Sequence, residues 1–178
     1  MFSRLFLILL SVSLLMPTTA YAQTTVTIDN TEYRKKVLKY LSSDYFITEG
    51  VGLKNAYIGQ TTAQLIAALG QPATKKKQGL FTGLAAYTFQ LDNETVLQAG
   101  IKNGKVQAIA LAGNISSQYT TMKGVRFEMT AYEVMNLYGT QAVKKNSITY
   151  NKLGIRFDFK NNKLRVMRVF PPKQEIFR

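Results

Sequence analysis

Basic side chains flank two short turns in the sequence and offer the chemistry of anion binding. Lys102 and Lys105 enclose an Asn-Gly pair, and Lys160 and Lys163 enclose an Asn-Asn pair. Asn-Gly favours a two-residue β-hairpin, because both central residues of a type I′ turn adopt positive φ. Side chains alternate between the two faces of a strand, so we expect these hairpins to hold basic residues on one face. The candidate binding residues are Lys102, Lys105, Arg156, Lys160, Lys163 and Arg165.

Two further basic runs follow predicted short helices. They are Lys75, Lys76 and Lys77 after the first helix, and Lys144 and Lys145 after the second. A clamp for phosphate or carboxylate groups is one interpretation, and a solvated loop is the other. For the strand residues, lysines that protect a sheet from edge pairing are the alternative to a binding role. The sequence leaves these alternatives open.

The residue types of the commonest catalytic and metal sites are absent. The chain contains neither His nor Cys, which excludes Ser-His-Asp and Cys-His nucleophilic sites and metal sites built on imidazole or thiolate. Asp92 and Glu94 are close together, but they lie in a predicted turn, where turn-forming preferences account for them. No Ser stands three positions before a Lys, which excludes a Ser-Lys dyad of that spacing. We therefore predict a non-enzymatic protein with no cofactor and no metal ion.

The first 22 residues have the three parts of a cleavable signal peptide. Arg4 supplies a positive charge, an apolar run follows, and Ala20-Tyr21-Ala22 precedes the expected first mature residue, Gln23. The apolar run is shorter than the roughly 20 residues that span a bilayer. Because position 23 is not Cys, we do not expect a lipoprotein. The predicted location is the periplasm or the exterior of the cell.

The expected mature chain is strongly basic. Without Arg4 it has 22 Lys and Arg residues against 10 Asp and Glu residues, a net charge of +12. Such a charge attracts acidic proteins and anionic envelope components such as phospholipid headgroups or acidic wall polymers. Export makes nucleic acid an unexpected partner, whereas peripheral contact with a membrane or wall is compatible with the charge.

A capped-helix pattern occurs twice, with an offset of 69 residues. Thr61 and Gln64 in the first copy, and Thr130 and Glu133 in the second, have the spacing of a capping box at a helix start. Gly70 and Gly139 each follow as helix stops. Alternating apolar residues after each helix predict three strands per copy. Thr31 to Ser42 also shows the apolar periodicity of a helix.

These elements predict an α+β fold, in which an N-terminal helix precedes two similar helix-plus-three-strand units with antiparallel sheet. The expected segments are the signal peptide (1–22), the N-terminal helix and connector (23–54), the first unit (55–114), the second unit (122–170) and a tail (171–178).

The expected hairpin registers assign the two faces of the strands. Ile101 opposite Val106 places Ala99 opposite Ala108 on the core face, and Phe159 opposite Leu164 places Phe157 and Val166 there. The same registers place Arg168 on the core face. They also place four apolar residues on the polar face, where they would form a seam between the units or an apolar part of a binding surface. These four residues are Ile109, Leu111, Met167 and Val169.

The stretch from Gly59 to Pro72, with its Gly-x-Thr start and Leu-Gly-x-Pro end, resembles the SmpA/OmlA family of outer-membrane assembly lipoproteins, which includes BamE. Tyr87-Thr88-Phe89 and the hairpin after it fit the order of elements in that family. The tandem arrangement is similar to that of the β-lactamase-inhibitor protein and of the CAP-associated domain of bacterial wall proteins. These resemblances imply a fold, and we transfer no functional residue from them.

Together these features predict an exported, non-enzymatic binding module of the cell envelope. It would bind an acidic protein or an anionic envelope component through an open basic sheet face, as an adaptor, inhibitor or immunity protein. The alternative is a module that associates with a cell wall or lipid surface by charge alone. Affinity for such a surface would fall steeply with salt.

Overall fold

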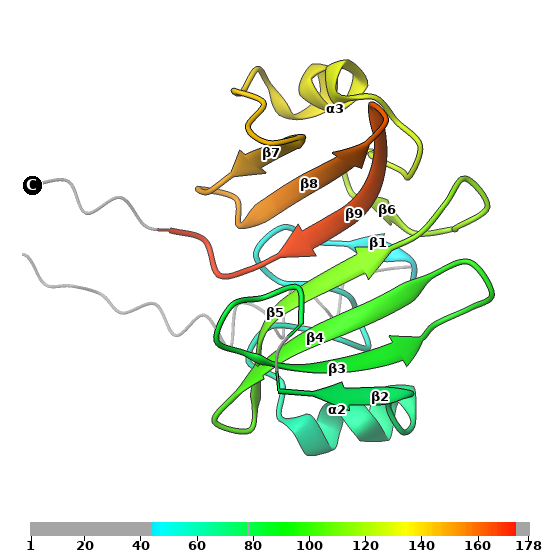
Figure 1. Ribbon diagram of the computed structural model, residues 1–178, viewed down its shortest axis with the longest axis vertical. Helices are drawn as coiled ribbons and strands as arrows, with labels where there is room; N and C mark the ends of the chain where they lie inside the picture. Colours follow the sequence, from blue (N-terminus) through cyan, green and yellow to red (C-terminus); the bar gives the residue numbers. More distant parts are fainter. Residues whose placement is uncertain (1–43, 78, 174–178) are drawn as a thin grey trace, which may run out of the picture.

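The computed structural model describes residues 44–77 and 79–173 (Figure 1). The predicted signal peptide and the predicted helix at 31–42 lie outside the described residues. The described chain has two short helices, α2 (Thr62–Leu69) and α3 (Ala131–Tyr138). Its strands are β1 (Phe46–Ile47), β2 (Thr74–Lys76), β3 (Ala85–Gln90), β4 (Val96–Lys102), β5 (Lys105–Ala112), β6 (Thr120–Thr121), β7 (Ser147–Tyr150), β8 (Ile155–Lys160) and β9 (Lys163–Val169).

Both helices begin at the capping boxes that the sequence indicates. The Thr61 hydroxyl accepts a hydrogen bond from the Gln64 backbone N–H at 3.2 Å, and the Gln64 side chain accepts one from the Thr61 N–H at 3.0 Å. Thr130 and Glu133 make the same reciprocal pair. Gly70 and Gly139 follow the last helical residues with φ of 81° and 91°, a region that glycine enters without steric cost. The predicted helix starts and stops are confirmed.

The architecture above these elements differs from the prediction. Seven strands form one sheet in the order β2-β3-β4-β5-β9-β8-β7, and all its neighbouring strands are antiparallel. A small parallel sheet pairs β1 with β6. The chain is mostly β, so the predicted α+β fold of two helix-plus-three-strand units is wrong. The physical reason is the β5–β9 pairing, which joins both halves into one sheet, while β2 adds a strand to the first half alone.

Two β-bulges overturn the predicted assignment of faces. The register shifts between Gly100 and Ile101 and again between Asp158 and Phe159, which leaves Gln107 with no opposite residue in β4 and Arg165 with none in β8. Because strand side chains alternate with a period of two, one extra residue moves all that follow to the other face. Val166 therefore lies opposite Asp158, and Ala108 lies opposite Gly100.

The four apolar residues predicted for the polar face are instead buried in the core. Leu111 pairs with Met167 and Ile109 with Val169 across the β5–β9 junction, and all four are fully buried. They form the seam between the two halves of the sheet, which was one of the two predicted alternatives. Arg168, expected on the core face, lies on the opposite face, as its pairing with Arg156 shows.

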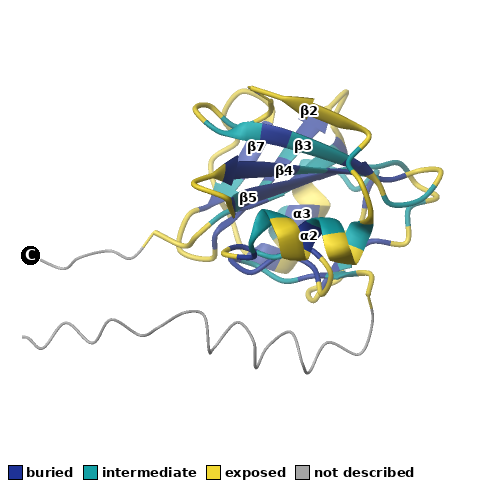
Figure 2. Ribbon diagram, turned by 90° about the horizontal axis from the view of Figure 1, so that it is seen from below, coloured by how far each residue is buried: buried dark blue, intermediate teal, exposed yellow. Residues whose placement is uncertain are grey.

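One hydrophobic core lies between the sheet and the two helices. Figure 2 shows α2 and α3 on the same side of the sheet. Leu65 of α2 and Val134 and Tyr138 of α3 belong to the same buried cluster as the sheet residues. Burial, followed by the hydrogen bond that its hydroxyl donates to Glu49, raises the pKa of Tyr138. This contact ties the segment before α2 to α3, so the core is shared by distant parts of the sequence.

Glycines allow the segment around residue 50 to pack closely against the turn between β7 and β8. Gly154 has a φ of 73°, and a Cβ there would lie 2.2 Å from the Phe170 carbonyl oxygen. Its own carbonyl oxygen accepts hydrogen bonds from the Phe170 N–H at 3.0 Å and the Gly50 N–H at 3.4 Å. Only a residue without a side chain fits this close approach.

Within the described residues, neither helix has the length and apolarity needed to cross a bilayer.

Candidate binding site on the outer face of the sheet

The outer face is the face of the seven-stranded sheet opposite the helices. Cross-strand pairing places Thr149 of β7, Arg156 of β8 and Arg168 of β9 in one row on it. The row continues through Ala110 of β5 to Gln98 of β4. The strand ladder thus holds two arginines side by side at a fixed position, although 12 positions separate them in the sequence.

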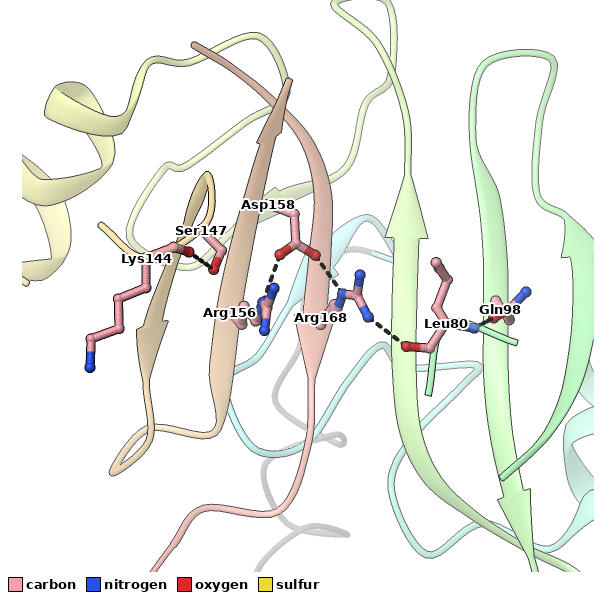
Figure 3. Close-up of polar contacts among 7 residues, drawn as sticks. All are labelled: Leu80, Gln98, Lys144, Ser147, Arg156, Asp158 and Arg168. Atoms are coloured by element: carbon pink, nitrogen blue, oxygen red, sulfur yellow. Dashed lines mark hydrogen bonds and ion pairs between the residues drawn. The ribbon is translucent and has the colours of Figure 1, made fainter. Parts of the chain in front are cut away.

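Asp158 lies between the two arginines and pairs with both. Its Oδ1 is 2.6 Å from Arg156 Nε, and its Oδ2 is 2.5 Å from Arg168 Nε (Figure 3). The Asp158 side chain is only 16% exposed, whereas that of Arg156 is 39% exposed. Two guanidinium groups share one carboxylate, so this cluster keeps one net positive charge.

A loop from the β2–β3 connection lies on the outer face and is fastened to the same cluster. Arg168 Nη1 donates to the Leu80 carbonyl oxygen at 2.7 Å, and the Leu80 N–H donates to Gln98 Oε1 at 2.6 Å. The Phe81 ring centroid is 5.8 Å from the Arg168 guanidinium carbon. A Cβ on Gly79 would lie 2.3 Å from the Ala86 Cβ, so the loop rests directly on the strands. The predicted open sheet face is therefore partly covered.

A pocket of about 390 Å³ opens between this loop and the arginine row. Its walls combine apolar side chains with those of two threonines and two arginines. The lining residues are Leu80, Phe81, Thr82, Leu84, Thr149, Arg156, Arg168 and Phe170. Arg156 donates through Nε alone to the described residues, which leaves its two Nη groups available for an acceptor. Arginine donors of this kind bind planar anions such as carboxylates through paired hydrogen bonds.

The six primary candidate residues do not gather in one patch. Because β5 and β9 run antiparallel with Ile109–Ala112 opposite Val166–Val169, the two hairpin turns point to opposite ends of the sheet (Figure 1). Lys102 and Lys105 lie at one turn, and Lys160 and Lys163 lie at the other. The basic residues that were expected together on one face are therefore divided between the two ends of the sheet.

The arginines among the candidates are engaged in ion pairs. Arg165 occupies a bulge and pairs with Glu128, and Arg156 pairs with Asp158. Arg156 is the one predicted residue that lines the pocket. Sequence reasoning missed Arg168 because the bulge that reverses its face is invisible to a period-two assignment. The available signal was the apolar character of Met167 and Val169, because these residues fit a buried seam only if the register is shifted.

The secondary basic runs lie at the two opposite edges of the sheet. Lys75 and Lys76 belong to edge strand β2, and Lys77 follows them. Lys144 and Lys145 precede β7, the other edge strand. All five are exposed, and Lys75 Nζ lies 5.3 Å from the Tyr87 ring centroid. Lysines on an edge strand hinder pairing with another sheet, so the position of the β2 lysines has a structural explanation.

The described residues contain no group of three or more His, Cys, Asp or Glu side chains that could hold a metal ion. What the geometry offers is recognition of an anion next to apolar contacts. No step of covalent chemistry is assigned to it.

Comparison with known proteins shows that the chain matches one family and a few solved structures. An extracellular protein containing an SCP domain from Bacillus anthracis aligns over 64% of this chain and 44% of its own, at 14% identity and a TM-score of 0.47. A cysteine-rich secretory protein from Staphylococcus aureus aligns over 64% of this chain and 43% of its own, at 13% identity and a TM-score of 0.39. The chain thus spans less than half the length of either protein. No relative was found among curated proteins.

The family match covers most of the described chain. The family described as CAP-associated N-terminal matches residues 58–175, a range that includes both helices and the entire seven-stranded sheet. This confirms the resemblance to the CAP-associated domain. The resemblances to the SmpA/OmlA family and to the β-lactamase-inhibitor protein are not supported by these matches. The chain belongs to the CAP-associated N-terminal family.

Proposed function

We propose that this protein is an exported, non-enzymatic binding module of the cell envelope, and that it binds an acidic protein or an anionic envelope component through the outer face of its sheet. The observation that carries the proposal is the cluster of Arg156, Asp158 and Arg168 beside the pocket. One carboxylate neutralises half of its positive charge, and the Nη groups of Arg156 remain available to an anionic partner.

The rigidity of the site supports binding by the outer face. Arg168 is held by Asp158, by the Leu80 carbonyl oxygen and by the Phe81 ring. Groups that are ordered before binding lose less conformational entropy when the partner arrives. The lysines of the two turns and edges are exposed and add a long-range attraction for acidic partners.

Export rests on the pattern of the first 22 residues. Protein purified from its native host should begin at Gln23, because the small-x-small motif ends at Ala22. Intact mass spectrometry measures this directly, and a mass that includes residues 1–22 would contradict removal of the signal peptide.

Capture of partners from the host's own envelope extract tests the binding role. Immobilised mature protein is compared with Arg156→Gln and with Lys102→Gln, which removes the same charge at the β4–β5 turn, outside the pocket. We expect R156Q to lose at least nine-tenths of the captured partner, K102Q to retain most of it, and thermal melts to show both variants folded. Equal losses from both variants would contradict a site on the outer face.

The alternative, association with a wall or lipid surface by charge alone, makes a different prediction for the same capture. It requires steep loss between about 50 and 200 mM salt, since screening weakens contacts between exposed charges. It also requires that the paired reversals Lys102→Glu with Lys105→Glu and Lys160→Glu with Lys163→Glu have equal effects. Capture that resists salt and depends on Arg156 favours the outer-face site.

A further inference from the structure

We infer that the pocket beside Arg156 binds the C-terminal carboxylate of an extended peptide whose last side chain is apolar. The inference rests on the proposed binding role of the outer face and names the class of ligand that would occupy it. Three features meet at this place: available guanidinium donors, an apolar wall and the free edge of a strand.

The charge of the cluster matches a single carboxylate. Asp158 already accepts from Nε of both arginines, so a second monoanion would bring the cluster to neutrality. Arg156 offers Nη1 and Nη2, and the neighbouring Thr149 lines the same pocket and adds a hydroxyl donor. Paired donors on a guanidinium group match the two oxygens of a carboxylate.

The loop supplies the apolar contacts for the last side chain of the peptide. Leu80, Phe81 and Leu84 line one side of the pocket, and Phe170 lines it as well. Leu80 remains 43% exposed, although the hydrogen bonds at its backbone N–H and carbonyl fix its position. A bound apolar side chain would remove this surface from water, which is favourable by about 25 cal/mol per Å².

Among the described residues, β7 is the last strand of the sheet, and its outer edge pairs with no further strand at the same place. The Phe159 N–H donates to the Asn146 carbonyl oxygen at 2.8 Å. Hydrogen-bonded and non-bonded pairs alternate along an antiparallel ladder, so Thr149 and Arg156 form a non-bonded pair and the Thr149 backbone groups point away from β8. An extended peptide can add to such an edge through main-chain hydrogen bonds.

The length of this edge favours the end of a peptide over an internal segment. Ser147 is the other residue of β7 whose backbone groups point away from β8. Its N–H donates to the Lys144 carbonyl at 3.0 Å, and its carbonyl accepts from the Lys144 N–H at 2.8 Å. The free edge is therefore limited to the region of Thr149. A second pocket of about 390 Å³, lined by Thr149, Tyr150 and Leu153 among others, adjoins this region and can take a preceding side chain.

A phosphodiester, as in a phospholipid or a wall polymer, also carries one negative charge. It has no amide N–H and no peptide carbonyl to pair with the Thr149 edge, which is why we favour the peptide. The two ligand classes therefore become separate arms of one experiment.

Backbone NMR of the mature chain, with two hexapeptide libraries as probes, tests the inference. Both libraries are randomised at the first five positions and end in Leu or Phe, one with a free carboxylate and the other with a C-terminal amide. We expect the acid library to shift the amide resonances of Thr149, Arg156 and Arg168, and the amide library to bind at least tenfold more weakly. Equal shifts from both libraries would overturn the inference.

Two variants and a lipid probe complete the test. Arg156→Gln should weaken binding of the acid library at least tenfold, whereas Arg126→Gln, at an exposed arginine outside the pocket, should leave it unchanged. Equal losses from both variants would refute the site. If dihexanoyl phosphatidylglycerol shifts these resonances and the acid library does not, the ligand is a phosphodiester and the peptide assignment is wrong. Arg156-dependent capture from extract, without binding of either library, would overturn the peptide assignment and leave the proposed function standing.

Discussion

Truncation of Leu111 to Ala tests whether the two halves of the chain fold as one unit. Leu111 is fully buried in β5, next to Leu97 of β4 and opposite Met167 of β9. It therefore lies on the seam that joins the halves. The substitution removes three carbon atoms, which is worth about 2.4 kcal/mol at about 0.8 kcal/mol per buried methylene-sized group. The residual cavity adds to this, and Leu→Ala changes in cores cost about 2–5 kcal/mol.

The assay is equilibrium urea unfolding followed by far-UV circular dichroism and by tyrosine fluorescence, because the chain has 10 Tyr and no Trp. With a slope of about 2 kcal/mol/M, a loss of about 3 kcal/mol lowers the midpoint by about 1.5 M. We expect both probes to report one transition before and after the substitution. The matched control is Lys105→Ala in the same strand, whose exposed side chain should change stability by less than about 0.5 kcal/mol.

Two outcomes would refute the reasoning. A biphasic transition in the unmodified protein would mean that the halves unfold separately, as two independent units would. A loss of less than about 1 kcal/mol from Leu111→Ala would mean that the β5–β9 seam contributes little to the fold, contrary to the cost expected for a buried leucine.

Three further predictions concern local structure. Thr61→Ala and Thr130→Ala should each lower the free energy of unfolding by about 1 kcal/mol, as measured by urea melts. If neither substitution changes this free energy, the two hydroxyl groups do not stabilise the helix starts. Hydrogen bonds from Thr130 lower the pKa of Glu133, so its charge stabilises the fold above its unfolded pKa and this contribution disappears as pH falls through the folded pKa. Thermal melts should therefore show Glu133→Gln less stable than the parent at pH 7, by a difference that shrinks as the pH falls through the folded pKa of Glu133; a difference that does not change with pH would exclude the titration. Gly154→Ala should cost more than about 1 kcal/mol, because its φ is positive and a Cβ meets the Phe170 carbonyl; a smaller loss in a denaturant melt would show that the backbone relaxes.

Several features of the protein could be predicted from short stretches of sequence. The helix starts at Thr61 and Thr130 depend on residues three positions apart, and the structure confirms both. The two-residue turns at Asn103 and at Asn161 are present with the expected positive φ. Ile101 opposite Val106 and Phe159 opposite Leu164 also hold. These features were predictable because their interactions are local.

The tertiary structure alone decided how the strands combine and what the outer face carries. The junction of Leu111 with Met167 joins residues 56 positions apart, and no local pattern specifies it. The bulges at Gln107 and Arg165 interrupt the alternation on which face assignment depends, and they turn Arg168 outward beside Arg156. Local hydrogen bonds fix caps and turns within four residues, whereas strand partners and bulges are selected by packing of the entire core. The pocket exists because that packing brings the Leu80 loop and the two arginines together.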